Sequence, residues 1–245
     1  MYHTQPYGAG AAAGMCQKGR LVTDLVLLSH DDDGVATLTL NRPEAKNALS
    51  IALRDAVSGQ LAALAASDRV KVLVITGVGS TFSAGFDLKE FQNVGDQAFA
   101  DRLWASSDRF HRAFLEFPLP TIAAVNGPAI AGGCDLATLC DLRIAATTAS
   151  FSHPEVAFGN VAYGLLHDLV GGAVARELCL LGREVLADEA LSLHLVSAVV
   201  AEDALASEAA ALAGRLARCP AHVLRATKAK IIRRSRNTVL GTLDL

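Results

Sequence analysis

The sequence has no excess of positive charge. Its 22 Lys and Arg residues are outnumbered by 25 Asp and Glu residues, so the formal net charge at pH 7 is −3. Proteins that bind nucleic acid carry a basic surface whose field attracts phosphates. The composition therefore disfavours a polynucleotide partner, although local groups can still bind a small anionic ligand.

Long apolar runs and paired cysteines are also missing. No apolar run approaches the ~20 residues that a membrane span needs, and residues 1–20 lack the basic start and unbroken apolar core of a signal peptide. The five cysteines are odd in number, widely spaced and without a CxxC motif, so neither a disulfide framework nor a zinc site is indicated. These absences predict a cytoplasmic protein without a membrane partner, and a flexible tail over residues 1–20.

The remaining sequence is long and apolar enough for one globular domain with a sizeable core. It has 245 residues, of which 51% are hydrophobic and 19% charged. Strand-like runs that alternate with helical patterns predict an α/β fold with a largely parallel sheet, and helical patterns dominate after about residue 165. The predicted strands are 25–29 and 35–41, which form a hairpin, then 70–77, 121–127 and 141–146; the predicted helices begin at Ser50, near residue 96 and at Gly132.

Three loops carry the residues most suited to chemistry. They are SAGFDL (83–88), AIAGGCD (129–135) and HPEVAFG (153–159). The loops at strand ends of an α/β sheet converge at one edge. Convergence here would bring backbone N–H donors at glycines next to the carboxylates of Asp135 and Glu155. Such a set suits a reaction in which negative charge builds on a carbonyl oxygen while protons move nearby.

Each of these residues also has a structural interpretation. Asp135 can complement the positive end of a helix dipole, Asp87 can cap the helix that its loop enters, and Glu155 can be a solvated turn residue. His153 and His167 fit surface or hydrogen-bonded histidines better than bases. The sequence contains no GxSxG motif, which disfavours serine nucleophilic catalysis, and GVGSTFSAG lacks the Lys and the glycine spacing of a phosphate loop.

Four segments in order resemble the enoyl-CoA hydratase/isomerase (crotonase) superfamily. They are NRPEAKNAL (41–49), FSAGFDL (82–88), AAVNGPAIAGGCDLATLCDLRIA (123–145) and HPEVAFG (153–159). Each motif is modest alone, but the four at suitable intervals are highly specific. The resemblance implies a crotonase-like spiral of β-β-α units with a helical C-terminal layer. The expected division is a core over 21–200 and a helical region over 201–245 that is shorter than usual.

The resemblance also implies a role for particular residues. By analogy with the family, the N–H groups of Phe86 and Gly132 form an oxyanion hole for the thioester carbonyl, and Asp135 and Glu155 are the two catalytic acids. No metal or redox cofactor is implied, and coenzyme A enters as part of the thioester substrate. The residues implied to line the coenzyme A site are Glu44, Ala45, Lys46, Ala48, Ala84, Phe86, Asp87, Leu88, Lys89 and Gly132.

Two departures from the family pattern leave the reaction open. Asp135 stands where many hydratases carry Glu, whereas Asp at this position also occurs in dienoyl-CoA isomerases. The segment after Glu155 lacks the usual proline- and glycine-rich stretch. The expected function is enoyl-CoA hydration or isomerisation in fatty-acid or related acyl-CoA metabolism. The alternatives are a dienoyl-CoA isomerase-type proton shuttle and a non-catalytic acyl-CoA-binding protein. The resemblance further implies a homotrimer or a dimer of trimers.

Overall fold

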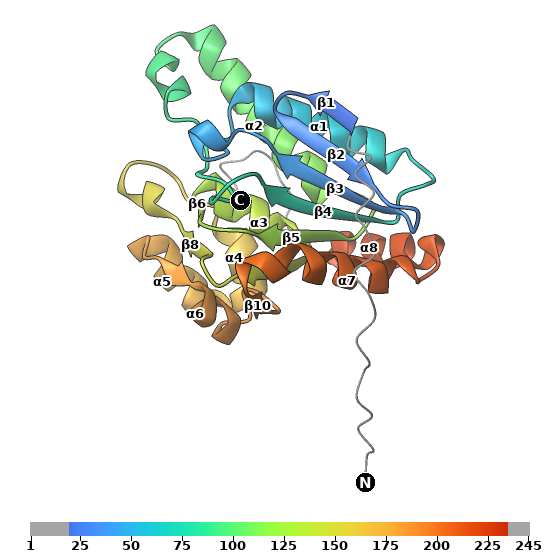
Figure 1. Ribbon diagram of the computed structural model, residues 1–245. Coiled ribbons are helices and arrows are strands. Elements are labelled where there is room, and N and C mark those ends of the chain that lie inside the picture. The colour runs from blue at the N-terminus through green and yellow to red at the C-terminus, as the bar shows by residue number, and fades with distance from the viewer. Residues whose placement is uncertain (1–19, 235–245) are drawn as a thin grey trace.

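The computed structural model describes residues 20–234, and its centre is a seven-stranded sheet (Figure 1). The strands are β1 (Arg20–Thr23), β2 (Val26–His30), β3 (Val35–Leu40), β4 (Val72–Gly77), β5 (Thr121–Val125), β7 (Leu142–Ala146) and β10 (Val199–Val200). They lie in the order β1-β2-β3-β4-β5-β7-β10. The first three strands pair in antiparallel fashion and the remaining neighbours pair in parallel, as the alternating pattern predicts.

The predicted hairpin and the first predicted helix form where local signals indicate. In the turn between β2 and β3, the Asp31 carboxylate accepts hydrogen bonds from the N–H groups of Asp33 and Val35, which is an Asx-type turn. The Ser50 hydroxyl accepts a hydrogen bond of 3.2 Å from the N–H of Leu53. This is the N-cap contact that satisfies one of the free donors at a helix start.

Helices cover both faces of the sheet (Figure 1). α1 (Ile51–Ala65) and α2 (Gln97–Leu115) pack against each other on one face. α7 (Leu205–Ala217) contacts β3, β4, β5 and β7 on the other face, and α8 (Ala221–Arg234) follows it. The helical C-terminal region therefore packs directly on the sheet, although its residues 235–245 lie outside the described part. The expected tail over residues 1–20 also lies outside it, except for Arg20, which begins β1.

The sheet divides the apolar core into two parts. Leu73 and Ile75 of β4 belong to the larger part, with α1 and α2, whereas Val72 and Val74 belong to the smaller part beneath α7. A strand buried on both faces shows this period of two. The side chains that α7 buries are mostly alanine, which allows the helix to lie close to the sheet.

A second, three-stranded sheet lies beside the main one, and the sequence does not predict it. Its strands have only two or three residues, too few for an alternating pattern to be visible. They are β6 (Ala129–Ile130), β8 (Ser150–Ser152) and β9 (Val185–Leu186). The remaining elements are α3 (Gly132–Leu139), α4 (Tyr163–Val170), α5 (Gly172–Leu181), α6 (Ala187–Ser192), and the 3-10 turns η1 (Pro43–Ala45), η2 (Glu90–Asn93), η3 (Pro154–Ala157) and η4 (Glu202–Ala204).

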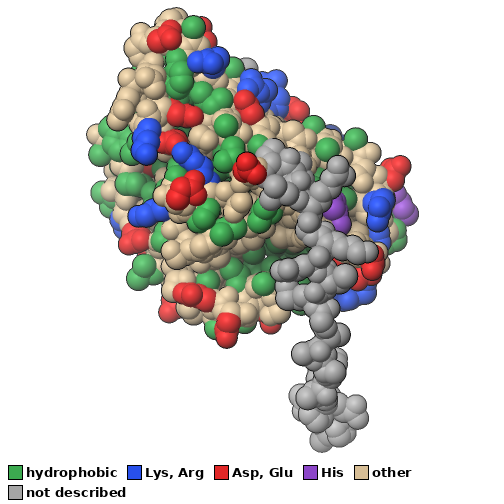
Figure 2. Space-filling view, turned by 45° about the horizontal axis from the view of Figure 1, so that its top comes forward, with side chains coloured by type: hydrophobic (Ala, Val, Ile, Leu, Met, Phe, Trp, Pro, Cys, Tyr) green, Lys and Arg blue, Asp and Glu red, His purple; other side chains and the backbone are tan. Residues whose placement is uncertain are grey.

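The described surface carries mixed charge. On the face shown in Figure 2, acidic and basic side chains are interspersed among apolar and neutral ones. No helix within residues 20–234 combines the length and the apolar character needed to cross a membrane. The cysteines in this part of the chain are free thiols, at Cys134, Cys140, Cys179 and Cys219, and Cys16 lies outside the described residues.

A buried ion pair joins the C-terminal helix to the sheet. Lys228 of α8 donates to both carboxylate oxygens of Asp141, at 2.6 and 2.7 Å, and 6% of its side chain is exposed. The Asp141 carboxylate also accepts hydrogen bonds from the N–H and the hydroxyl of Thr121, the first residue of β5. Since Asp141 directly precedes β7, the pair connects α8 to the N-terminal ends of two neighbouring strands.

Replacing Lys228 by methionine should destabilise the fold, because Asp141 would lose its cation in a largely buried position. Removing one partner of a buried pair costs about 3–5 kcal/mol, and we expect the lower end because the Thr121 hydrogen bonds remain. Urea unfolding measures the change in the free energy of unfolding. Lys230 is exposed on the same helix, so Lys230→Met is the matched control and should change it by less than about 0.5 kcal/mol. Equal effects of the two substitutions would contradict the role of the pair.

Candidate functional site

The loop at residues 82–86 is fixed by contacts to two distant segments. The Ser83 carbonyl accepts a hydrogen bond of 2.9 Å from the N–H of Ile130, the residue at the end of β6. The Ser83 hydroxyl donates to the Asn47 carbonyl at 2.9 Å. The loop therefore lies between the NRPEAKNAL segment and the strand that leads into α3, so three of the four sequence motifs meet here.

The start of α3 lies directly against this loop. A Cβ atom on Gly133 would lie 2.2 Å from the carbonyl oxygen of Ser83, whereas one on Gly132 would lie 2.9 Å from the Phe86 ring. A side chain can turn away, but a backbone carbonyl held by hydrogen bonds cannot. Gly133 is therefore the residue whose missing side chain allows the helix and the loop to approach.

The backbone N–H groups of Phe86, Gly132 and Gly133 at this contact have no hydrogen-bond acceptor within residues 20–234. Within residues 20–234, neither Phe86 nor Gly132 donates its N–H to another group, and a Cβ on Gly85 would lie 3.0 Å from the Gly132 nitrogen. Ala131, just before the helix, has φ 53° and ψ −127°, a conformation that costs a residue other than glycine about 1–3 kcal/mol. Strain of this kind persists where the surrounding structure enforces it, and the dipole of α3 adds partial positive charge at Gly132.

Phe86 packs on a buried arginine that the sequence motifs do not include. Arg54 of α1 is fully buried, and its guanidinium carbon lies 4.4 Å from the centre of the Phe86 ring. It donates hydrogen bonds to the carbonyls of Leu49 and Leu103. Burial lowers the pKa of Arg54 to about 10, so the group is still cationic at neutral pH and holds the ring by a cation–π contact. The sequence signal that could have identified Arg54 is its position beside the apolar face of the predicted helix.

The two predicted acids, of which Asp135 is buried and Glu155 mostly buried, both face one histidine. Asp135 is 7% exposed and His153 is 2% exposed. The Nδ1 atom of His153 lies 2.8 Å from Glu155 Oε1, and its Nε2 atom lies 3.8 Å from Asp135 Oδ1. The helix α3 positions Asp135 in its first turn, and η3 positions Glu155, so the structure brings the two acids together around an imidazole ring.

This environment changes the pKa values of Asp135 and His153. Burial raises the pKa of Asp135 to about 7, while His153 opposes the rise and Glu155 adds to it. Burial alone lowers the pKa of His153, but the Cys134 side chain and the carboxylates of Glu155 and Asp135 raise it well above its usual range. A carboxyl group whose pKa lies near neutrality can give or take a proton at physiological pH.

The structure corrects the interpretation of one histidine and confirms that of the other. His167 is about half exposed and contacts Asp168, as expected at a surface. His153 is neither at the surface nor fully hydrogen-bonded, because its Nε2 atom has no partner among the described residues. β8 and Pro154 at the start of η3 direct this side chain inward. Glu155 is not a solvated turn residue either, since 14% of its side chain is exposed and it bonds to His153.

The residues expected to line a coenzyme A site lie around the loop. Leu88 is 65% exposed, and Lys46 and Lys89 are exposed cations. Asp87 is mostly buried: its carboxylate forms an ion pair of 2.7 Å with Arg42 and accepts a hydrogen bond from the N–H of Lys89. Asp87 therefore closes a local turn but is not the cap of the helix that follows, because the N-cap of η2 is Lys89, which makes no side-chain cap hydrogen bond.

Comparison with known proteins decides the family. A family model described as enoyl-CoA hydratase/isomerase matches residues 30–244. The chain belongs to the enoyl-CoA hydratase/isomerase family. A probable enoyl-CoA hydratase of Mycobacterium bovis is 38% identical over 212 residues, which cover 84% of this chain and 81% of that protein. A crotonyl-CoA hydratase of Syntrophomonas wolfei is 37% identical over 199 residues, 78% of this chain and 75% of that protein.

Solved structures of this family have the same fold. An enoyl-CoA hydratase of Mycobacterium smegmatis matches with a TM-score of 0.81 and 35% identity, over 88% of this chain and 85% of that one. An enoyl-CoA hydratase/carnithine racemase of Magnetospirillum magneticum matches with a TM-score of 0.82 and 30% identity, over 91% of this chain and 85% of that one. These similarities confirm the crotonase-like α/β fold and the enzyme family that the four motifs imply.

Replacing Gly133 by alanine should destabilise the protein, because the new Cβ would overlap the Ser83 carbonyl. Overpacking costs about 1–3 kcal/mol, and we expect the upper end because backbone must move. Thermal unfolding measures the change. Gly59 of α1 has nothing within 4 Å of its Cβ position, so the control Gly59→Ala should stabilise the helix by about 0.5–1 kcal/mol. A Gly133→Ala protein as stable as the wild type would contradict the close contact.

Proposed function

We propose that the protein adds water to, or isomerises, the double bond of an enoyl-CoA thioester. The observation that carries the proposal is the acid pair of the buried Asp135 and the mostly buried Glu155, in the same site as N–H groups of Phe86 and Gly132 that have no acceptor within residues 20–234. Relatives named as enoyl-CoA and crotonyl-CoA hydratases support the substrate class. Fatty-acid or related acyl-CoA metabolism is the proposed context.

The two N–H groups would act as an oxyanion hole. Attack of water on the β carbon of a 2-enoyl thioester moves charge to the carbonyl oxygen, and donors fixed in advance stabilise that charge at no cost in reorganisation. Loss of one such donor costs about 3–4 kcal/mol in other enzymes. The tight contact at Gly133 and the stack of Phe86 on Arg54 would hold the two donors in place.

The acid pair would move the protons of the reaction. In hydration, one carboxylate takes a proton from water as the oxygen bonds to the β carbon, and the other carboxyl gives a proton to the α carbon. In isomerisation, the same groups would remove a proton from one carbon and return one to another. Both reactions balance without a redox agent or metal, so we propose no cofactor other than the coenzyme A of the substrate.

Coenzyme A would bind along the rim of the loop at residues 82–86. The exposed cations Lys46 and Lys89 suit the phosphates of the coenzyme, and the exposed Leu88 offers an apolar contact. Main-chain groups would supply much of the remaining recognition. The other residues that we propose for this surface are Glu44, Ala45, Ala48, Ala84, Phe86, Asp87 and Gly132.

A dienoyl-CoA isomerase-type proton shuttle is the second candidate, and the length of the Asp135 side chain favours it. Aspartate reaches less far than glutamate by one methylene, and a misplacement of ~1 Å can lower a rate by ~100-fold. A group that only transfers a proton to carbon does not also have to fix a water molecule. A protein that binds acyl-CoA without turnover is the remaining outcome of the test below.

We further propose that the chain assembles as a homotrimer or a dimer of trimers in the cytoplasm. Several of the large apolar side chains exposed in residues 20–234 lie in one region, from the end of η3 to α6, which favours a subunit contact there. They are Phe158, Leu180, Leu181, Leu186 and Leu191. The free thiols suit a reducing compartment.

Substitution of Glu155 by glutamine should abolish most turnover while the fold is kept, because the amide is nearly isosteric but cannot exchange the proton. Acid–base groups contribute about 10²–10⁴-fold to rate, so we expect a loss in that range. The assay follows the absorbance of the conjugated enoyl thioester with a panel of 2-enoyl- and 3-enoyl-CoAs of increasing chain length. Acyl-CoA affinity, measured by calorimetry, should change little.

The exposed Glu184 provides the control for this substitution. Glu184→Gln should retain wild-type turnover. Full turnover by the Glu155→Gln protein would refute the assignment of Glu155. If the wild-type protein binds acyl-CoA tightly and turns over no member of the panel, the protein is a binder and the proposed reaction is wrong.

Extension of Asp135 to glutamate separates the two candidate reactions. In a hydratase limited by short reach, the longer side chain should raise hydration, by up to about 10-fold if part of a ~1 Å misplacement is recovered. In an isomerase it should crowd the buried site and lower isomerisation by a similar factor. The same panel, with products separated by chromatography, measures both rates. The isomerase interpretation expects the longer side chain to slow isomerisation. An Asp135→Glu protein that isomerises faster than the wild type would therefore contradict it.

A further inference from the structure

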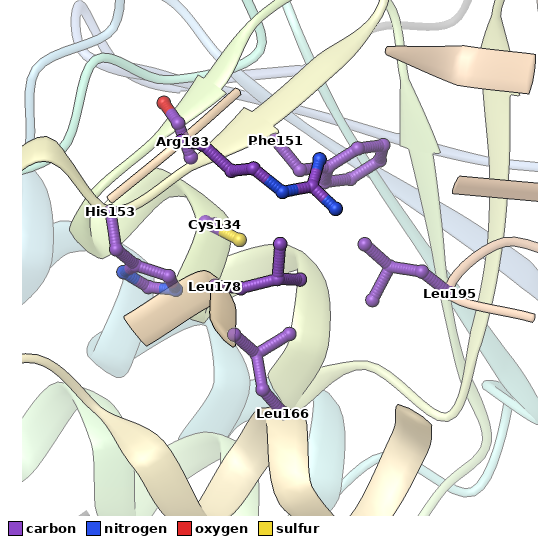
Figure 3. A pocket seen from close by; sticks show the side chains of 8 residues that line it. Cys134, Phe151, His153, Leu166, Leu178, Arg183 and Leu195 are labelled. Carbon is purple, nitrogen blue, oxygen red and sulfur yellow. The ribbon is translucent and has the colours of Figure 1, made fainter. Parts of the chain in front are cut away.

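The two donor N–H groups of the site are held by different means. The helix α3 begins at Gly132, and behind it the side chains of Cys134, Leu166 and Leu178 lie around a cavity of only about 10 Å³ (Figure 3). This is room for roughly one water molecule, so α3 has little space to move away from the loop. The N–H of Phe86 lies in the loop itself, and loops are more mobile than the elements that they connect. Its direction therefore has to be fixed by contacts from outside the loop.

A hydrogen bond to the Gly85 carbonyl sets the direction of the Phe86 N–H. The Leu49 N–H donates to this carbonyl at 2.7 Å, and Leu49 lies alongside Phe86 in an isolated parallel bridge. The Gly85 carbonyl and the Phe86 N–H belong to one planar trans peptide group, so they point in opposite directions. With its carbonyl turned toward Leu49, the group presents the Phe86 N–H on its far side. Accepting a hydrogen bond also polarises an amide, which makes its N–H a better donor.

Arg54 contacts both residues of this bridge. Its Nη1 atom donates to the Leu49 carbonyl, and its guanidinium carbon lies 4.4 Å from the centre of the Phe86 ring. The other donors of the guanidinium bind α2, where they reach the Leu103 carbonyl at 3.2 Å and the Ser106 hydroxyl at 3.3 Å. Because the guanidinium is planar and its donors diverge in fixed directions, one group can hold several acceptors while it lies over the ring.

The burial of this cation indicates a role beyond packing. Arg54 is 0% exposed, and the acids whose charges act on it bind other groups: Glu90 accepts a hydrogen bond from the N–H of Ile51, and Asp55 pairs with Arg109. A buried charge without an ionic partner costs stability. Position 54 lies beside the apolar face of α1, where an aliphatic side chain would fill the space without that cost.

We propose that Arg54 is a positioning residue that holds the peptide group between Gly85 and Phe86 so that the Phe86 N–H faces the thioester oxygen. The inference rests on the proposed function, since the oxyanion hole serves that reaction. Arg54 acts at two points, the Leu49 carbonyl and the Phe86 ring, and connects both to α2. A donor that is aligned in advance stabilises charge as it develops, so the contribution of Arg54 belongs to the transition state more than to substrate binding.

The test compares two substitutions of Arg54. Arg54→Met has a similar length but neither charge nor donors, whereas Arg54→Lys keeps the charge but cannot donate to separated acceptors while it covers the ring. With the best enoyl-CoA of the panel, kcat should fall about 100-fold for methionine, the effect of a misplaced catalytic group, and about 10-fold for lysine. KM should change by less than about 3-fold, because the interaction is made in the transition state.

Arg112 provides the matched control, since it is an exposed arginine on α2. Arg112→Met should have the wild-type kcat and KM. All variants are assayed below the temperature at which they begin to melt, so that a loss of stability does not enter the rates.

A spectroscopic measurement of the oxyanion hole needs no turnover. Acetoacetyl-CoA is a thioester whose enolate absorbs in the near ultraviolet, and donors at the carbonyl oxygen lower the pH at which the bound thioester forms that enolate. For the wild type, a pH titration of the absorbance should have its midpoint below that of free acetoacetyl-CoA. Arg54→Met should raise the midpoint by about one unit or more, which corresponds to about 10-fold weaker stabilisation of the enolate.

The outcomes separate a positioning role from a structural one. A folded Arg54→Met protein with the wild-type kcat and the wild-type enolate midpoint would overturn the proposal. If Arg54→Met does not fold, Arg54→Lys is judged by the same two measurements, and wild-type values for it would overturn the proposal.

The enolate titration also separates this proposal from the proposed function. If the wild-type protein turns over no enoyl-CoA, the proposed function fails, and the midpoints of the wild type and the Arg54 variants still decide the role of Arg54. A wild-type protein that leaves the midpoint of acetoacetyl-CoA unchanged has no oxyanion hole to position, and the assignment of Arg54 would then be wrong.

Discussion

The contact between the Ser83 carbonyl and the α carbon of Gly133 is the constraint on which the site depends. It is a contact of backbone with backbone, so no side-chain rotation can relax it. The hydrogen bond from Ile130 to the same carbonyl fixes its direction. Because the N–H groups of Phe86 and Gly132 lie within three residues of this contact on their own segments, it sets their separation. It also sets the start of α3, and so the direction in which Asp135 points.

The regular elements and the family could be predicted from the sequence, because local patterns carry that information. Ser50 caps its helix and the turn at Asp31 closes its hairpin as short-range chemistry requires. The small sheet of β6, β8 and β9 could not be predicted, since its strands are too short to have a period. His153 was not recognisable either: whether a histidine beside a proline turns inward depends on the pairing of β8 with β6, which is a tertiary property.

The site concentrates groups that most of the protein avoids. Buried polar atoms usually have a hydrogen-bond partner, yet in the described part of the chain Asp135 Oδ1, His153 Nε2 and Glu155 Oε2 have none. The three atoms belong to one cluster, and Ala131, the N-cap residue of the helix that carries Asp135, has a costly backbone conformation. Such a cluster lowers stability, and it persists where the unsatisfied atoms are needed by a ligand. The extensive apolar core around it supplies the compensating stability.

The division of the core into two parts affects which substitutions the protein can accept during evolution. Phe82, Cys134 and Leu136, which surround the site, belong to the larger cluster, whereas α7 packs on the opposite face of the sheet and contributes only to the smaller one. The sheet separates the two clusters. Substitutions along α7 that preserve volume can therefore accumulate without moving the acids, so this helix can drift in sequence, or be redesigned for a new partner, while the chemistry stays the same.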